Sequence, residues 1–435
     1  MIKHLYRHIA SWAGFFLLAA LLISCAKESS VVDSPEVKQP QPAQTPIALS
    51  AYTAQPIAAS TRADQSLLAD HGIPNGKSIG VFAYYHQGTD SNSDGIIEDG
   101  TWSGDETPNF MFNQKATNDA AEDGFSYSPL KYWPNMLHDK LSFIGYYPYT
   151  TNLVGESPSD DRGIALSSNV EGLPAFELTV SNDVTKQVDF LISDLLTGLP
   201  NHTSAVSPSS ASDRDDLTIV DKVRLLFHHA TSKVTIRIAI DEDIREDFMS
   251  MTISKLELTN IYRKGTVTPS YAPLTGTTTI NVTGASESQN YTIVNVPEDP
   301  EDPVINHLTD TYLMLPQTLA YDADDSDNPV KNAQINISYS ITLRSHGTVY
   351  TYEEVNEKIV ETETDHYTYS NTASLPLAEM KMASAPTTAI TSWLPNHHYI
   401  YTIRLTAKRI EFTGEVVEWG QEVPWDNIVV DQIGT

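Results

Sequence analysis

The segment Gly76–Gly80, Gly-Lys-Ser-Ile-Gly, has the glycine-x-serine-x-glycine spacing that presents a serine nucleophile at a sharp turn. Such a turn follows a strand and opens a helix. Here a Pro74-Asn75 turn precedes the serine and the β-type run Ile79–Tyr85 follows it, so the context does not fit a nucleophile. A phosphate-binding loop would need glycine at position 71, which His71 occupies. We therefore predict no catalytic residue and no enzymatic activity.

Three segments contain residue types that could bind a metal ion through oxygen or nitrogen atoms. Asp90–Gly95 has the Asp-x-Asn-x-Asp-Gly spacing of a calcium loop, but the twelfth loop position, which should supply a bidentate carboxylate, is Thr101. A hairpin loop explains the same residues, and the sequence leaves both readings open. His228-His229 and His397-His398 lack a third ligand nearby. We predict no metal site and no cofactor.

Aromatic residues cluster at Tyr132-Trp133 and at Tyr146–Tyr149. Such clusters can form a platform for a carbohydrate, because the ring faces are apolar and the hydroxyl and indole groups are polar. Large aromatic side chains more often fill the core of a β-sandwich. We therefore favour a core role.

Cys25, the only cysteine, ends an amino-terminal leader. A short basic start is followed by the apolar stretch Ile9–Ile23, which is short for a membrane-spanning helix and typical of a signal peptide. The ending Leu22–Cys25 resembles the lipobox of bacterial lipoproteins, in which the cysteine thiol takes a diacylglycerol. A thiol suits this reaction because its thiolate is a strong nucleophile. We predict a signal peptide over residues 1–24 and lipidation of Cys25.

The net charge of the chain limits the classes of molecule that its folded part can bind. The chain has 27 basic and 56 acidic residues, a net charge of −29 and a pI near 4.6, which argues against binding to nucleic acid or to an anionic membrane. Residues 25–46 are rich in Ser, Pro, Gln, Glu and Ala and hold too few large apolar side chains to fold alone. We predict that they form a flexible tether.

The rest of the chain consists of short β-type runs separated by turns rich in proline and glycine. These β-type runs are 77–85, 140–147, 233–238, 334–341 and 399–405. Apolar and polar residues alternate in several of them, which is typical of strands with one buried face. Asp243–Met251 is the one segment for which we predict a short helix. A polar stretch from Asn201 to Asp216 separates an aromatic-rich half from a half rich in Thr, Ile and Val. The pattern predicts antiparallel β-sandwiches with a domain boundary near 212/213.

These features together resemble a known family. The resemblance depends on the order of several segments, which are Phe110–Gln114, Tyr127–Asn135, Leu141–Pro148, Phe227–Val234, Leu315–Gln317 and Trp393–Tyr401. In this order, and with the lipobox, the chain resembles the Mfa-like branch of the fimbrillin family of Bacteroidales from about residue 47 to its end. Members are pilin subunits of type V fimbriae. The resemblance implies an all-β fold of two transthyretin-like antiparallel β-sandwich domains with Greek-key-type connections, here 63–212 and 213–435.

The resemblance also implies how the precursor is processed. Family members are exported as lipoproteins to the outer membrane, and a trypsin-like protease then cuts after an arginine and releases the first strand. The matching bond here is Arg62–Ala63, and the pro-segment 47–62 contains a strand bounded by Pro46 and Pro56. Lys27 and Lys38 are the only other basic residues between Cys25 and Arg62. We expect the cut after Arg62.

Removal of the first strand would leave a groove that a neighbouring subunit's strand can fill. The resemblance implies a donor from the carboxyl-terminal segment, here 423–433 with Trp425, Ile428 and Val430. The alternative is that this segment closes its own domain. The expected function is therefore a structural subunit of cell-surface fimbriae that supports adhesion. A tip or anchor adhesin of the same fold, which binds host protein or glycan, is the second reading.

Overall fold

The computed structural model describes the residues 45–53, 72–119, 124–136, 138–168, 171–200, 222–240, 249–293, 307–322, 332–355, 358–406 and 410–419. Regular structure in these residues consists of β-strands and the short 3-10 turns η2 (Val184–Lys186) and η5 (Leu377–Glu379). In the same residues, no helix is long and apolar enough to cross a membrane. The predicted all-β fold is confirmed.

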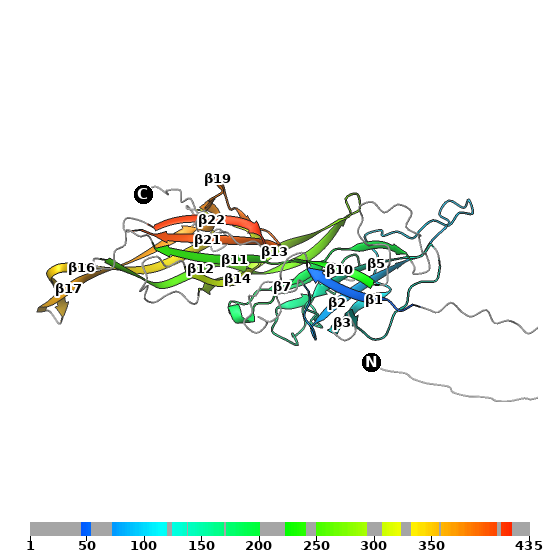
Figure 1. Ribbon diagram of the computed structural model, residues 1–435, viewed down its shortest axis with the longest axis horizontal. Coiled ribbons are helices and arrows are strands. Elements are labelled where there is room, and N and C mark those ends of the chain that lie inside the picture. Colours follow the sequence, from blue (N-terminus) through cyan, green and yellow to red (C-terminus); the bar gives the residue numbers. More distant parts are fainter. Residues whose placement is uncertain are drawn as a thin grey trace, which may run out of the picture. The chain divides into compact units, whose positions relative to one another are not determined.

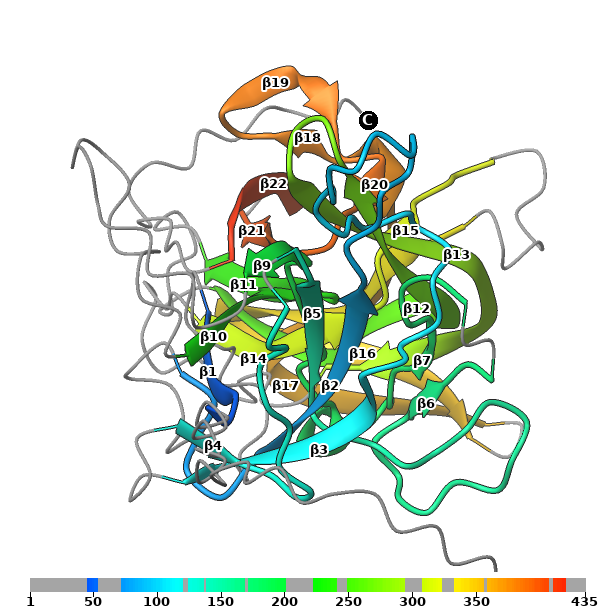
Figure 2. The same cartoon turned by 90° about the vertical axis from the view of Figure 1, so that its right-hand side faces the viewer.

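The first sheet has eight strands in the order β2-β3-β4-β1-β10-β8-β5-β9. Their bounds are β1 Ala48–Thr53, β2 Ser78–His86, β3 Met111–Asp119, β4 Gly124–Ser126, β5 Lys140–Tyr147, β8 Leu191–Ser193, β9 Leu196–Pro200 and β10 Lys222–His229. Because β5 also pairs with β2, all of these strands except β9 form a closed ring. Figures 1 and 2 both show β1, in dark blue, beside β10. The amino-terminal strand is thus a member of a closed sheet.

Two six-stranded sheets are built mainly from later residues. One has the order β14-β11-β21-β22-β18-β19, and the other has the order β17-β16-β12-β7-β6, with β13 paired to β12. The bounds of these strands and of the small β15–β20 pair are β6 Ile164–Leu166, β7 Phe176–Thr179, β11 Ser232–Ile240, β12 Met249–Ala272, β13 Thr277–Thr292, β14 His307–Met314, β15 Gln317–Thr318, β16 Gln334–Val355, β17 Lys358–Pro376, β18 Lys381–Met382, β19 Ala385–Ala389, β20 Ser392–Trp393, β21 His397–Leu405 and β22 Ile410–Glu418.

Strand alternation determines which side chains enter the core. In β10, Val223, Leu225 and Phe227 are each at most 1% exposed, whereas Arg224 between them is exposed. Successive side chains of a strand point to opposite faces, so this pattern buries one face. Most pairs are antiparallel, but β1–β10, β11–β21 and β18–β22 are parallel.

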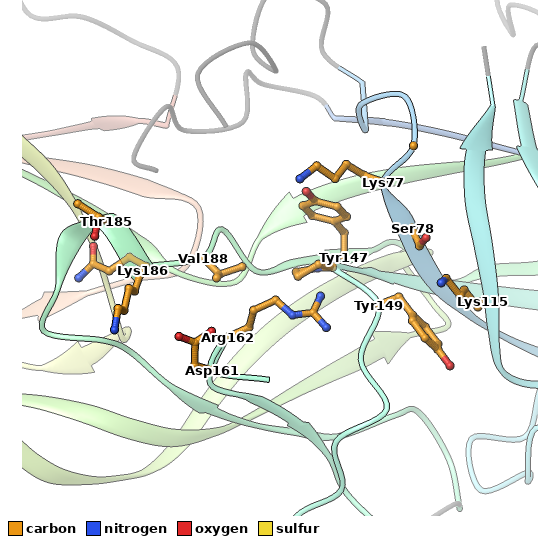
Figure 3. A pocket seen from close by; sticks show the side chains of 13 residues that line it. Lys77, Ser78, Lys115, Tyr147, Tyr149, Asp161, Arg162, Thr185, Lys186 and Val188 are labelled. Atoms are coloured by element: carbon orange, nitrogen blue, oxygen red, sulfur yellow. The ribbon is translucent and has the colours of Figure 1, made fainter. Parts of the chain in front are cut away.

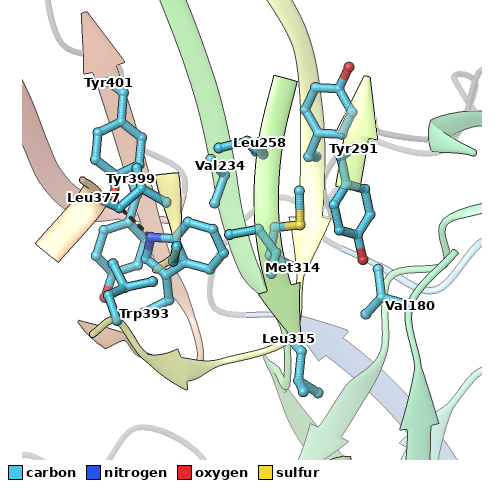
Figure 4. Close-up of a cluster of buried hydrophobic side chains, with 14 of the residues drawn as sticks. Val180, Val234, Leu258, Tyr291, Met314, Leu315, Leu377, Trp393, Tyr399 and Tyr401 are labelled. Carbon is cyan, nitrogen blue, oxygen red and sulfur yellow. Dashed lines mark hydrogen bonds between the residues drawn. The ribbon is translucent and has the colours of Figure 1, made fainter. Parts of the chain in front are cut away.

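Two hydrophobic clusters fill the interior. One lies within the ring and joins β1 to β2, β5 and β10. The larger one contains buried residues of β2 and β5 together with those of β11, β12, β14, β16 and β21. Figure 4 shows part of this cluster, where the Trp393 indole nitrogen donates to the Tyr401 hydroxyl oxygen at 2.8 Å.

Strands from both halves of the sequence share sheets. β10, which follows the predicted boundary at 212/213, pairs with β1 and β8, and β12 pairs with β7 of the first half. The boundary itself lies outside the described residues. The division into domains 63–212 and 213–435, and the transthyretin-like form of each, remain predictions. The predicted helix Asp243–Met251 is wrong at its end, because Met249 to Met251 belong to β12; its remaining residues are outside the described ones.

Candidate functional site

The strand β1 is the structural feature that bears most directly on the predicted assembly. It pairs with β10 in parallel along its whole length, from Ala48↔Lys222 to Thr53↔Phe227. On its other side it pairs with β4 only at Leu49↔Phe125. β1 is therefore fully paired along one edge and barely paired along the other.

Side chains on one face of β1 are buried. Ile47, just before the strand, is 2% exposed, Leu49 is 1% exposed and Thr53 is 3% exposed, whereas Tyr52 on the opposite face is 44% exposed. Ile47 and Leu49 share a core cluster with Phe125, Trp133, Val223 and Leu225. Burying a side chain of this size removes about 1.5–3 kcal/mol of unfavourable water contact. The strand thus completes the core of the ring.

The residues just before β1 are held by a second set of contacts. The Ile47 amide donates to the Lys131 carbonyl oxygen at 2.9 Å, and the Trp133 amide donates to the Thr45 carbonyl oxygen at 3.1 Å. The Tyr127 hydroxyl donates to the Ile47 carbonyl oxygen at 2.7 Å. Burial raises the pKa of the Tyr127 hydroxyl, so it stays protonated and able to donate at neutral pH. The segment that starts at Thr45 is therefore an integral part of the fold.

Glycine allows the close approach of β4 to β1. A Cβ atom added at Gly124 would lie 2.8 Å from the backbone carbonyl oxygen of Leu49. A side chain there would have to displace the β1 backbone. Nothing in the sequence indicates the contact between Gly124 and β1, because it appears only once β4 and β1 are paired.

The six predicted site residues lie outside the described residues. They are Cys25, Arg62, Ala63, Trp425, Ile428 and Val430. The structure does place the strand that precedes Arg62, since β1 begins and ends within the predicted pro-segment 47–62. Lipidation, cleavage and strand donation remain predictions.

The serine of the Gly76–Gly80 motif does not stand on a nucleophile turn. Gly76 has φ +77° in a turn, and Ser78 is the first residue of a strand rather than of a helix. Its hydroxyl lies 2.9 Å from the Thr117 hydroxyl on β3. The geometry agrees with a strand start.

The Asp90–Gly95 loop uses its side-chain oxygens to bind its own backbone. Asp90 accepts from the amides of Asp94 and Gly95 at 3.1 and 2.9 Å, and Asn92 accepts from the Asp94 amide at 3.2 Å. The loop is closed by the bridge between Thr89 and Glu98. These contacts are typical of a hairpin loop, which was the alternative to a calcium-binding loop.

The histidine pairs also have local partners. His228 Nε2 lies 3.2 Å from Asp194 Oδ2, and the buried His229 Nδ1 lies 2.8 Å from Asp189 Oδ1. His398 Nε2 lies 2.9 Å from the Thr235 hydroxyl. Within the part of the chain that the structure describes, no group of three or more His, Cys, Asp or Glu side chains could hold a metal ion.

The aromatic clusters are mostly core. Trp133, Tyr146 and Tyr147 are at most 7% exposed, as the favoured reading predicted, whereas Tyr132 is 40% exposed and Tyr149 is half-buried.

The fold and the site define an all-β protein whose first sheet is completed by an amino-terminal strand. The chain belongs to the Fimbrillin-like family, whose profile matches residues 61–419. It is 30% identical over 161 residues to the fimbrium subunit Fim1C of Phocaeicola vulgatus, a match that covers 36% of this chain and 37% of that protein. The matched segment thus spans about a third of that relative's length.

One solved structure agrees on the fold. The chain is similar to a crystal structure of a fimbrial protein from Bacteroides vulgatus, with 18% identity, a TM-score of 0.50 and coverage of 86% of this chain and 99% of that chain. It is also similar, more distantly, to the tip fimbrial protein Mfa3 from Porphyromonas gingivalis, with 9% identity, a TM-score of 0.35 and coverage of 86% and 100%.

Proposed function

We propose that this chain is a structural subunit of a cell-surface fimbrium and that β1 occupies, in the precursor, the place of a neighbouring subunit's strand. Cleavage after Arg62 releases β1, and the carboxyl-terminal segment 423–433 of another subunit takes its position. The lipid on Cys25 holds the precursor at the outer membrane until the cut. The observation that supports this proposal most directly is the position of β1, which closes the ring between β10 and β4.

The energetics favour replacement over an empty groove. Without β1, the backbone groups of β10 that face it lose their partners, and each buried unpaired group costs about 1–3 kcal/mol. The apolar side chains that pack on Ile47 and Leu49 lose their cover as well. A sheet opened in this way offers two edges to an added strand. An incoming strand therefore restores both sets of contacts.

The proposed donor has residues suited to the same face. Ile47 and Leu49 are two residues apart, so both point into the core from one face of the chain. Ile428 and Val430 have the same spacing. Trp425 adds a larger apolar side chain nearby. Cleavage also removes Cys25 and its lipid, which frees the subunit to join a polymer.

Two variants test the cut and the donor separately. Arg62→Ala should keep β1 attached and abolish polymer ladders on SDS gels, and mass spectrometry of the protein from cells should show no amino terminus at Ala63. Ile428→Asp should be cut normally and still fail to polymerise, because a carboxylate cannot enter the apolar groove.

The matched control is Arg214→Ala, which removes an arginine from the acidic stretch 213–216 and should polymerise like the natural chain. Normal polymerisation of Arg62→Ala would contradict the processing step. Normal polymerisation of Ile428→Asp would assign the donor to another segment.

A further inference from the structure

A cavity of about 490 Å³ lies near the start of β2, and none of its lining residues belongs to β1. It is lined by residues from the turn before β2, from β3, from the segment after β5, from the loop before β6 and from η2. Pockets of roughly 300–1,000 Å³ are typical of sites for small molecules. Figure 3 shows side chains from these separate elements around one opening.

The charge of this cavity opposes that of the chain. Four of its 13 lining residues are basic, and Asp161 is its one acidic lining residue, whereas the whole chain has 27 basic residues among 435 and a net charge of −29. The basic lining residues are Lys77, Lys115, Arg162 and Lys186. A concave surface with an excess of basic groups attracts small ions of the opposite sign. The cavity is therefore suited to an anion.

Arg162 is already oriented. Its Nη2 donates to Asp160 Oδ2 at 2.5 Å, and its backbone amide donates to Asp160 Oδ1 at 3.1 Å. The Arg162 guanidinium holds the pKa of the Asp160 carboxyl below its usual range, so this ion pair persists at neutral pH. A guanidinium has five N–H donors, and one contact to Asp160 leaves donors for a carboxylate or sulfate.

Aromatic rings accompany the cations. Tyr147 and Tyr149 line the same cavity, and Lys115 Nζ lies 5.7 Å from the centre of the Tyr149 ring. The view in Figure 3 shows Tyr147 between Lys77 and Arg162. A bare phosphate or sulfate ion gains nothing from ring faces, whereas the C–H face of a sugar packs on them and its hydroxyls bond to the polar rim.

We propose that this cavity binds an anionic saccharide, a sugar that carries a carboxylate or a sulfate group. Arg162 and Lys186 pair with the anionic group, and Tyr149 packs against the sugar ring. The proposal goes beyond subunit assembly and does not depend on strand exchange. It gives this subunit a direct contact with acidic glycans.

The experiment is a calorimetric or NMR titration of the full chain, in detergent, with matched sugars. Glucuronic acid carries a carboxylate where glucose has a hydroxymethyl group, and glucose 6-sulfate carries a sulfate at the same position. The three sugars together show whether the cavity prefers a carboxylate or a sulfate. We expect at least one anionic sugar to bind about tenfold or more tightly than glucose, with an affinity that falls as salt is raised. A tetraglutamate peptide serves as the acidic-peptide probe.

Three variants test whether the sugar binds in this cavity. Lys186→Gln and Tyr149→Ala should each weaken the anionic sugar several-fold, and Arg162→Gln should weaken it more. Lys381→Gln, at an exposed position of β18, removes the same charge elsewhere and should leave binding unchanged. Thermal unfolding of each variant shows that the fold is retained.

Three outcomes would overturn the proposal. These are equal binding of glucose and both anionic sugars, the absence of binding by either anionic sugar, and binding that none of the three cavity variants weakens. Tighter binding of tetraglutamate than of any sugar would reassign the cavity to an acidic peptide. None of these results bears on the cut after Arg62, so the two proposals fail separately.

Discussion

Strands β1 and β21 each lie between two neighbouring strands of a sheet, and both have a parallel neighbour, yet they are held differently. β21 pairs with β11 from Lys233↔His398 to Ile240↔Leu405, and with β22 along its full length. β1 has one complete ladder, with β10, and a single pair with β4. A strand held on both sides leaves only when the domain unfolds. A strand held mainly on one side needs fewer bonds to break before it departs.

The largest expected effect tests the strand that should not leave. Ile403 in β21 is fully buried, and Ile403→Ala removes its packing and leaves a cavity. We expect a loss of about 2–5 kcal/mol in the free energy of unfolding, measured as a lower midpoint of urea unfolding. A change below about 0.5 kcal/mol, the usual range for surface substitutions, would mean that β21 contributes little to stability.

Leu49→Ala in β1 is the matched substitution in the strand that should leave. Leu49 is 1% exposed, so the local loss is again about 2–5 kcal/mol. We expect it to appear as faster amide hydrogen exchange over 48–53, with a smaller change in the urea midpoint than Ile403→Ala causes, because β1 can open locally. Equal midpoint changes for the two variants would remove the contrast between the strands.

Two glycines give a smaller and sharper comparison. Gly124→Ala places a Cβ against the backbone of Leu49, so the β1 strand itself must shift to make room. We expect the free energy of local opening of β1 to fall by about 1–3 kcal/mol. Gly414→Ala in β22 places a Cβ against the Cδ1 methyl of Ile390, the end of a flexible side chain, and should cost less. Hydrogen exchange of β1 distinguishes them. The comparison fails if Gly414→Ala exposes β1 as much as Gly124→Ala does.

Acid should weaken the ring that contains β1. Burial lowers the pKa of His86 in β2, and nearby Glu106, 3.2 Å away, opposes this shift only in part. The unfolded chain, with a histidine pKa of about 6.5, then binds more protons below that pH than the folded chain does, so acid favours unfolding.

The measurement for His86 is the urea midpoint above pH 6.5 and below it. Stability should fall as the pH drops below about 6.5. His86→Gln keeps a polar side chain near Ser142, whose hydroxyl lies 2.7 Å from His86 Nε2, and should show a shallower fall. This is the smallest effect of the series, and identical pH profiles for the two chains would rule out His86 as its source.

Alternation in the sequence predicted where strands lie but not which strands meet. The runs 77–85 and 140–147 appear as Ser78–His86 and Lys140–Tyr147, because a short apolar run bounded by turns is a local signal for a strand. The expected single buried face is wrong for these two strands, since nearly every residue of each is buried and the side chains are divided between the two hydrophobic clusters. The parallel pairing of Ala48–Thr53 with Lys222–His229 joins segments far apart in the chain, and no local pattern specifies it.

The sites divide in the same way. The strand before Arg62 could be predicted from the family resemblance and its flanking prolines. The basic cavity could not, because Lys115, Arg162 and Lys186 come from separate elements and each looks like an ordinary surface cation in the sequence. Gly124 escaped notice for the same reason, since only the folded sheet places it against Leu49.

The parallel register between β1 and β10 also has a mechanical meaning. Consider a donor strand in the position of β1 that the next subunit pulls along its length. The subunit that contains β10 holds β10 in place against this pull. The force then acts along the strands, so all the hydrogen bonds of the ladder share the load and must yield together. A strand peeled from its end would lose the same bonds one at a time under a much smaller force. A polymer joined by such ladders would resist stretching by flow better than one whose strands could be peeled apart.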